Sequence, residues 1–426
     1  MAHLTNRSAY DKLTMRLNKV PQGAPPAEVL YDILKMLFSA KEAELVSVLP
    51  IKPFSVKRAS KIWKKSISET QNLLETLASR GLLLDYIDEN QQTFVLPPTM
   101  AGFFEYSLMK YRNDIDQNRL SQLFHQYLNV EEDFVGHLFA SSETQLGRAL
   151  INEETLPENN FAEVLDYERA TEIIKTSPMI GVGVCYCRHK MQHMGTACDA
   201  PMDICMTFNT SAESLIKHGV AREIDEVECM ELLHQAYDHN LVQFADNVQQ
   251  GVNFICNCCG CCCEAMLAAK RFAFAQPVHT SNYCAEIEEE TCTGCGKCVD
   301  VCPVEAMSQV SAGDPHIKKK KKARLNKELC LGCGVCVRVC PHMSISMKPI
   351  DQRVITPLNS AHRIVNMAIE KGMLQNLIID TQALYHHRVM NLILGAILKM
   401  PPVKQIMASK QMKSRYLEWL FGRMNI

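Results

Sequence analysis

Residues 292–303 read CTGCGKCVDVCP and residues 330–341 read CLGCGVCVRVCP, so the pattern Cys-x2-Cys-x2-Cys-x3-Cys-Pro occurs twice. Thiols at every third residue let one loop surround three corners of an iron–sulfur cube, while the fourth cysteine begins a helix that points to the other cube. Zinc sites usually close on two pairs of cysteines, so this spacing disfavours zinc, and its repetition disfavours chance. Two glycines in each loop allow a close approach to the inorganic core: Gly294, Gly296, Gly332 and Gly334.

The segment 285–348, which contains both copies, resembles the bacterial two-cluster ferredoxins. This resemblance implies a ferredoxin-like βαβ repeat that binds two 4Fe-4S clusters. It also implies one ligand set for each cluster: Cys292, Cys295, Cys298 and Cys340 for the first, and Cys330, Cys333, Cys336 and Cys302 for the second.

The insert between the two repeats departs from the ferredoxin pattern. It carries five successive lysines, Lys318–Lys322. We interpret this run as the solvated tip of a hairpin. The alternative is a docking patch for an acidic redox partner, because a local positive field steers the encounter between proteins.

The cysteines are confined to one part of the chain. All 20 lie between Cys185 and Cys340 of 426 residues, a length that allows about three domains. The N-terminus carries no export signal, and dense cysteine in a reducing compartment favours metal ligation over disulfides. With 45 basic and 47 acidic residues, there is no global bias toward nucleic acid or membranes. We therefore expect a cytoplasmic protein whose chemistry lies in this stretch.

A second group of cysteines precedes the ferredoxin-like segment: Cys185, Cys187, Cys198 and Cys205. Their number suits a further 4Fe-4S cluster, and zinc or structural and redox-active thiols are the alternatives because the spacing is irregular. Arg188 and Lys190 would offset the charge of a cluster if they face it, and otherwise they are solvated. We interpret His189 and His193 as hydrogen-bonding neighbours, with ligation as the alternative.

The densest group lies in FICNCCGCCCE, residues 254–264. Adjacent side chains cannot all face one metal, so some of these thiols must serve a second centre or point elsewhere. The triplet Cys258-Cys259-Gly260 is similar to the CCG motif of heterodisulfide reductase subunits, without its second copy. The group comprises Cys256, Cys258, Cys259, Cys261, Cys262 and Cys263.

We interpret these six cysteines as a further cluster site. The alternatives are ligands that complete the upstream cluster, a disulfide-exchange site and inert thiols. We therefore expect a third iron–sulfur cluster within residues 185–263 and leave a fourth open. Cys229 is expected in the core. Cys284 is expected to be an ordinary buried thiol, with a role as a distant ligand as the alternative.

The N-terminal residues resemble a winged-helix unit by pattern. We expect helices at 27–38 and 41–48, and a third helix begins at a capping box formed by Ser66 and Glu69. That helix should place Ile67, Leu73, Leu74 and Leu77 on one side, and Gly81 should terminate it. Two apolar runs, 82–86 and 93–96, predict a hairpin.

The whole chain is expected to be α+β, with a mostly helical N-terminal half, a cysteine-rich middle, a ferredoxin-like module and a helical C-terminal tail. The expected divisions are a winged-helix-like domain at 1–100, a helical connector at 101–180, a cysteine-rich cluster-binding region at 181–284, a dicluster ferredoxin domain at 285–348 and a helical segment at 349–426. Helices are expected at 167–176, at 225–239 with Val227, Met230, Leu233 and Tyr237 on one face, and at 360–371, 381–399 and 404–423.

This order of units resembles 4Fe-4S dicluster domain-containing proteins of anaerobic bacteria, and the resemblance implies electron transfer. We interpret the chain as a multi-cluster iron–sulfur electron carrier, or as a relay subunit of an oxidoreductase complex, with redox proteins as partners. One alternative is a cluster-dependent reductase of a disulfide or small molecule at Cys256–Cys263. Another is a redox-sensing DNA-binding regulator that uses the basic stretch 52–65, which Glu69 and Glu75 disfavour.

The C-terminal helices carry an apolar face followed by basic residues. The apolar run 389–398 is too short to span a bilayer, which takes about 20 residues. We interpret these helices as packed on the core or on a subunit. The alternative is a peripheral contact with a membrane surface.

Overall fold

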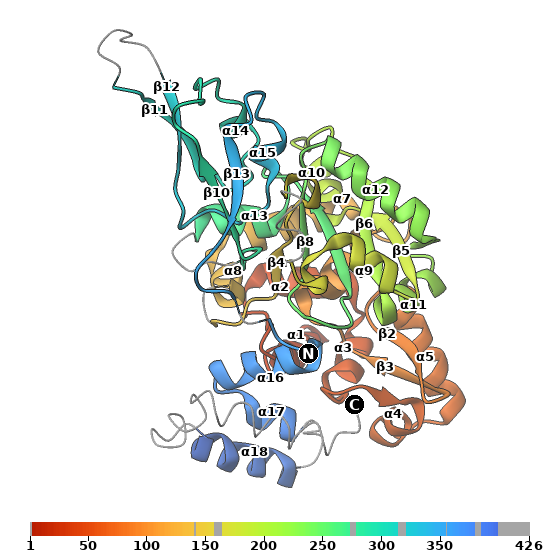
Figure 1. The fold of residues 1–426 in the computed structure, drawn as a ribbon. Coiled ribbons are helices and arrows are strands. Elements are labelled where there is room, and N and C mark those ends of the chain that lie inside the picture. The colour runs from red at the N-terminus through yellow and green to blue at the C-terminus, as the bar shows by residue number, and fades with distance from the viewer. Residues whose placement is uncertain are drawn as a thin grey trace.

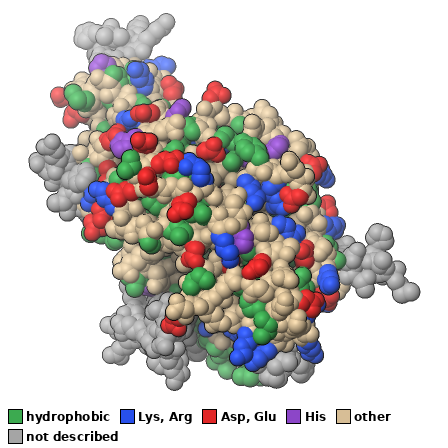
Figure 2. Space-filling model, turned by 90° about the vertical axis from the view of Figure 1, so that its right-hand side faces the viewer, with side chains coloured by type: hydrophobic (Ala, Val, Ile, Leu, Met, Phe, Trp, Pro, Cys, Tyr) green, Lys and Arg blue, Asp and Glu red, His purple; other side chains and the backbone are tan. Residues whose placement is uncertain are grey.

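The computed structural model describes residues 2–139, 142–156, 164–272, 278–313, 321–354, 356–379 and 385–398. It combines helices and sheets around a cysteine-rich middle, which confirms the α+β prediction at this level. The N-terminal helices lie at one end of the molecule, the repeat segment lies at the other, and a six-stranded sheet lies between them (Figure 1). Acidic and basic side chains are interspersed over the face shown in Figure 2.

The N-terminal unit contains a small antiparallel sheet with strand order β1-β3-β2, and helix α4 packs against β1 and β3. The predicted helices at 27–38 and 41–48 are present, with ends that differ by one residue. The elements are α1 (Ala2–Leu17), α2 (Glu28–Leu37), α3 (Ala40–Ser47), β1 (Phe54–Ser55), α4 (Val56–Trp63), α5 (Ile67–Ser79), β2 (Leu84–Asp88) and β3 (Gln91–Val95).

The observed helix α5 differs from the predicted one in two details. Ser66 caps it by accepting from the Glu69 amide at 3.2 Å, but the Glu69 carboxylate pairs with Lys65 instead of completing a capping box. The predicted apolar side holds for Leu74 and Leu77, which are buried, whereas Ile67 is 59% exposed. Ile67 begins the helix, where the core does not cover it. Gly81 adopts the expected left-handed conformation, with φ of +72°.

The next segment leads from these helices into the central sheet. It contains α6 (Phe104–Leu108), α7 (Gln117–His125), α8 (Glu132–Phe139), β4 (Gly147–Ala149) and α9 (Ala170–Thr176). Strand β4 pairs with the central sheet, so the segment 101–180 contributes a strand as well as helices.

The central sheet has six strands in the order β4-β8-β9-β6-β5-β7, and every neighbouring pair is antiparallel. Its other strands are β5 (Ile180–Val184), β6 (Asp203–Phe208), β7 (Arg222–Ile224), β8 (Val242–Asp246) and β9 (Phe254–Cys258). The helices that follow them are α10 (Tyr186–His193), α11 (Asn209–Lys217), α12 (Glu226–Asp238) and α13 (Glu264–Arg271).

Helix α12 matches the helix predicted at 225–239. Leu233, Tyr237 and Cys229 are buried, which confirms Cys229 as a core residue. Val227 is 66% exposed, so its predicted place on the apolar face is wrong. It lies in the first turn of the helix, where the core does not cover it.

The repeat segment contains two antiparallel strand pairs and two short helices. Strand β10 (Tyr283–Ile287) pairs with β13 (Ile345–Pro349), and β11 (Met307–Ser311) pairs with β12 (Lys321–Leu325). The helices are α14 (Lys297–Asp300) and α15 (Val335–Arg338). Of the five successive lysines, Lys321 and Lys322 begin β12, whereas Lys318–Lys320 lie outside the described residues.

Three helices follow the repeat segment: α16 (Ser360–Glu370), α17 (Leu374–Ile378) and α18 (Tyr385–Leu398). Arg363 of α16 forms a buried ion pair with Asp246 at the end of β8. On α18, Leu392 and Ile393 are exposed. The helix predicted at 404–423 lies outside the described residues. Within the described ranges, no helix has the length and apolar character needed to cross a membrane.

Candidate metal centres

In the repeat segment, backbone N–H groups lie close to sulfur atoms of the two cysteine loops. Backbone amides point at three of these sulfurs: Ala306 N lies 3.2 Å from Cys302 Sγ, Ala323 N lies 3.5 Å from Cys292 Sγ, and Ser344 N lies 3.3 Å from Cys340 Sγ. Such donors stabilise negative charge on a sulfur ligand.

Glycine is required in both loops. Gly332 has φ of +68°, and a Cβ there would lie 2.1 Å from the Tyr283 carbonyl oxygen. Gly294 has φ of +67°, and a Cβ there would meet the Lys321 carbonyl oxygen at 2.1 Å. The loops therefore pack against strands β10 and β12 at distances that exclude any side chain.

Residues 291–344 match the family model of the 4Fe-4S dicluster domain. This segment is an iron–sulfur, ferredoxin-like module. We call residues 283–349 the dicluster module. No curated protein matches the chain. The eight repeat cysteines supply the thiolate set that two clusters need, and together with the other cysteines they indicate an iron–sulfur electron-transfer protein.

Cys284 lies beside one of the module's cysteines. A hydrogen bond from Cys284 lowers the pKa of Cys330 to about 6, although burial opposes this shift. Cys284 is expected to be an ordinary buried thiol, but its side chain on β10 is only partly buried and contacts Cys330. Burial raises the pKa of Cys333 to about 12, so binding of a positively charged metal is what would hold this thiol ionised.

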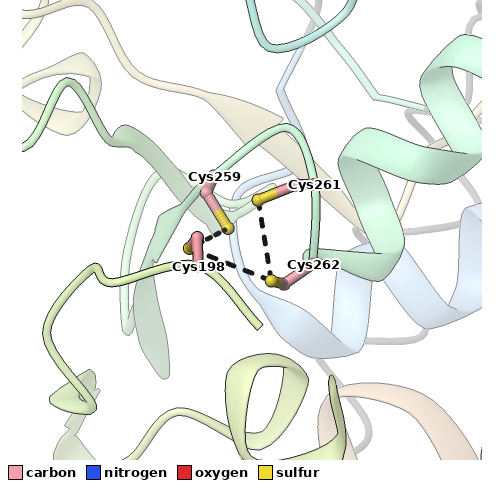
Figure 3. A group of neighbouring side chains, drawn as sticks. All are labelled: Cys198, Cys259, Cys261 and Cys262. Carbon is pink, nitrogen blue, oxygen red and sulfur yellow. Dashed lines mark hydrogen bonds between the residues drawn. The ribbon is translucent and has the colours of Figure 1, made fainter. Parts of the chain in front are cut away.

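Four of the ten remaining clustered cysteines meet in a compact group, which we call the quartet: Cys198, Cys259, Cys261 and Cys262. Cys198 comes from the loop between α10 and β6, and the other three come from the turn between β9 and α13 (Figure 3). All four sulfur atoms lie within 4.8 Å of one another. This is the one such group within the residues that the structure describes.

The other six form a second group, which we call the sextet: Cys185, Cys187, Cys205, Cys256, Cys258 and Cys263. Five of these thiols make successive contacts: Cys187 meets Cys263, Cys263 meets Cys258 at 3.1 Å, Cys258 meets Cys256, and Cys256 meets Cys205. All six, together with Cys259 of the quartet, line a cavity of about 90 Å³. One water needs about 10–15 Å³ on the same scale, so the cavity has room for a larger group.

Local structure explains why neighbouring cysteines separate into two groups. Cys256 and Cys258 are two residues apart on β9, so their side chains point to the same side of the sheet. Cys259 is the first residue after β9, and its sulfur joins the quartet while its side chain still borders the cavity. The turn at Gly260 then redirects the chain, and Cys263 returns to the sextet as the residue that precedes α13.

The four upstream cysteines therefore do not form a centre of their own. Cys198 lies in the quartet, whereas Cys185, Cys187 and Cys205 lie in the sextet. The adjacent thiols of residues 254–264 fall into two groups, as expected if adjacent side chains cannot all face one metal.

Arg188 is the buried cation between the two groups. It is 1% exposed, and its guanidinium donates to the carbonyl oxygens of Pro201 at 2.9 Å and Asn257 at 2.7 Å. Its Nε has no partner, and no carboxylate pairs with it among the described residues. Burial by itself would lower the pKa of Arg188, but the sulfur atoms of Cys185 and Cys259 raise it. The site is therefore built to face negative charge.

The remaining polar residues of α10 have other partners. Lys190 is fully buried in an ion pair with Glu264, so it neither faces the thiols nor is solvated. His189 Nδ1 contacts the Leu108 carbonyl oxygen at 2.8 Å, and its Nε2 lies 3.2 Å from His193 Nε2. These contacts support the interpretation of both histidines as hydrogen-bonding neighbours.

Sequence reasoning missed Glu105, which lines the cavity of the sextet. Burial raises its pKa to about 8, while the amides of Ala101 and Gly102 donate to its carboxylate at 2.8 and 3.1 Å. No motif surrounds Glu105, and it lies far from the cysteines in sequence. Only the packing of α6 beside α10 brings it to the cavity.

Proposed function

We propose that the protein is a multi-cluster electron carrier that relays single electrons between the dicluster module and a third iron–sulfur cluster held by the sextet. The observation that carries this proposal is a shared apolar core. Cys258 and Cys263 of the sextet are buried in the same core against which Cys302, Cys330 and Cys333 of the dicluster module pack. Buried apolar side chains therefore join the two sets of ligands.

Direct contacts between the dicluster module and the central sheet region support the same electron path. A Cβ on Gly260 would lie 2.7 Å from the carbonyl oxygen of Pro303, the residue after Cys302. The Asn152 amide donates to the Cys333 carbonyl oxygen at 3.0 Å. The dicluster module is thus held against the central sheet at the loops that carry its cysteines.

The residues of the chain have distinct parts in this proposal. A 4Fe-4S cluster supplies a one-electron carrier with a potential set by charge, hydrogen bonds and exposure. Arg188 offsets the negative charge of the thiolates in the cysteine-rich middle of the chain. In the dicluster module, backbone amides offset the negative charge of the sulfur ligands. Cys295 is exposed, so the loop that holds it is the proposed port for a redox partner protein.

This exposure also supports a proposal about the environment. A solvent-exposed iron–sulfur cluster is open to oxygen, so we propose that the protein works without oxygen in a reducing cytoplasm. The number of clusters, two in the dicluster module and one in the sextet, belongs to the same proposal.

The N-terminal unit is proposed to be a winged-helix-like docking domain for another protein. Its sheet order β1-β3-β2 with α4 and α5 packed alongside supports this pattern. Lys65, one of its basic residues, is paired with Glu69 rather than directed to a separate anion. This pairing favours protein over nucleic acid as the partner.

The relay is tested by EPR of anaerobically reconstituted protein reduced with dithionite. The wild type is expected to show three interacting centres. Cys205→Ala is expected to lose the third centre and its magnetic interaction, while it retains the pair in the dicluster module. Cys229→Ala, which truncates a core cysteine outside both groups, is the matched control. Unchanged spectra and unchanged iron in Cys205→Ala would overturn the proposal.

A further inference from the structure

The quartet differs from an iron–sulfur cluster site in the spacing of its sulfur atoms. Cys198 Sγ lies 3.6 Å from Cys259 Sγ and 3.9 Å from Cys262 Sγ, and Cys261 Sγ lies 3.6 Å from Cys262 Sγ. A tetrahedron of thiolates around one zinc, with Zn–S bonds of about 2.3 Å, has edges of roughly 3.8 Å. The quartet therefore has the dimensions of a site for a single ion.

The other cysteines of the chain provide an internal comparison. A cubane binds each thiolate to a different iron, so it holds its four sulfurs farther apart than one ion does. Within the described residues, which include all eight cysteines of the dicluster module, only the quartet gathers its sulfurs within 4.8 Å. The sextet surrounds a cavity that Cys259 of the quartet also reaches, whereas Cys198, Cys261 and Cys262 do not line it.

The charge around the quartet also fits a single divalent ion. Four thiolates and one divalent cation leave a net charge of about −2, which must be offset when it is partly buried. The Arg188 guanidinium forms a hydrogen bond with Cys198 and interacts with Cys259. A donor of this kind orients ligands and stabilises their charge.

We propose that the quartet binds one metal ion, Zn²⁺ or a single iron, in a tetrathiolate site, and holds no inorganic sulfide. The ion ties the loop that carries Cys198 to the turn 259–262. Both segments adjoin the sextet, since Cys258 and Cys263 flank that turn. The site therefore acts as a structural clip beside the proposed third cluster, and its existence does not depend on the relay.

The test measures zinc, iron and acid-labile sulfide per chain after anaerobic purification of the full-length protein. The variants are Cys261→Ala, whose side chain is exposed, and Cys198→Ala, which removes the ligand from the separate loop. Cys229→Ala is the control for loss of a cysteine outside the site. The EPR signal of the dicluster module reports whether each variant folds.

Both quartet variants are expected to lose about one metal ion per chain, with sulfide unchanged. Loss of zinc identifies the ion as Zn²⁺, and loss of iron without sulfide identifies a single iron. Loss of about four irons together with about four sulfides would overturn the proposal and establish a cluster in the quartet. A full metal content in both variants would also overturn it. Neither result bears on the proposed electron relay, which the Cys205→Ala variant tests separately.

Discussion

The dicluster module and the cysteine-rich middle assemble cysteines in opposite ways. In the dicluster module, two short repeats supply every predicted ligand. The glycines within each loop adopt the left-handed backbone conformation that the loop requires. In the middle, residues 185–187, 198–205 and 256–263 come together only when the central sheet forms. The comparison shows that local spacing can encode a cluster site, whereas a site made of distant segments is encoded by the fold that carries it.

The largest effect is expected from a ligand of the dicluster module. Cys336→Ala should lose about four irons and four sulfides per chain, because one cluster loses one of its four thiolate ligands. The middle should retain its metals, since its ligands belong to other segments. Metal and sulfide analysis checks this. Loss of the metals of the middle as well would show that the two regions do not assemble separately.

A substitution at the junction should affect both regions at once. In Gly260→Ala, the new Cβ would lie 2.7 Å from the Pro303 carbonyl oxygen and 2.9 Å from Pro303 Cα, so backbone must move. We expect the free energy of unfolding to fall by about 1–3 kcal/mol and the magnetic interaction between the regions to weaken.

Gly136→Ala on α8 is the matched control for Gly260→Ala, because nothing lies within 4 Å of its new Cβ. Denaturant titration and EPR measure the two effects. Equal behaviour of the two variants would contradict the close contact between the turn at Gly260 and the dicluster module.

Removal of the buried Arg188 charge should weaken metal binding by the cysteine-rich middle of the chain. Metal binding by the dicluster module should not change. Arg188→Gln is expected to lower metal affinity in the middle by about 10–100-fold, since a buried charge that faces the thiolates is lost. Chelator competition, followed by metal analysis, measures this. Arg222→Gln removes a surface arginine that pairs with Glu228 and serves as the charge-matched control. Equal resistance of the two variants to the chelator would show that Arg188 does not support the site.

The smallest effect, a loss of stability of about 1 kcal/mol between pH 6.5 and 5.5, concerns His279, which pairs with β4 at the join between the regions. Burial, together with Arg148, lowers the pKa of His279 to about 4, against about 6.5 when the chain is unfolded. The folded protein keeps His279 neutral, so its stability is full above pH 6.5 and decreases as the pH falls toward 4. We expect a loss of about 1 kcal/mol per pH unit within this window.

Denaturant titrations of the wild type and His279→Gln at several pH values measure this dependence. The variant should show a flatter profile between pH 6.5 and 5. Equal slopes for the two proteins would show that His279 does not carry the dependence.

The sequence predicts those features that rest on short-range patterns. The cysteine spacing of 292–340 identifies the dicluster module, and helices such as α2, α12 and α16 match their predicted ranges because their apolar periodicity is local. The partition of Cys258 and Cys259 between the sextet and the quartet is beyond such reasoning, because it depends on where β9 ends and the turn begins. Glu105 and the pairing of Lys190 with Glu264 likewise require tertiary contacts.

The burial of individual side chains is also set by tertiary packing. Ile67 and Val227 follow the apolar periodicity of their helices but lie in first turns that the core does not cover. Periodicity identifies a helix face, and the neighbouring elements decide how much of that face is buried.

The central claim is that iron–sulfur clusters are present both in the dicluster module and in the middle of the chain. The most direct measurement is iron and acid-labile sulfide per chain after anaerobic purification, combined with EPR of the dithionite-reduced protein. The account predicts about twelve irons and twelve sulfides, with one further metal ion in the quartet. About eight irons with eight sulfides would confine the clusters to the dicluster module and contradict the claim.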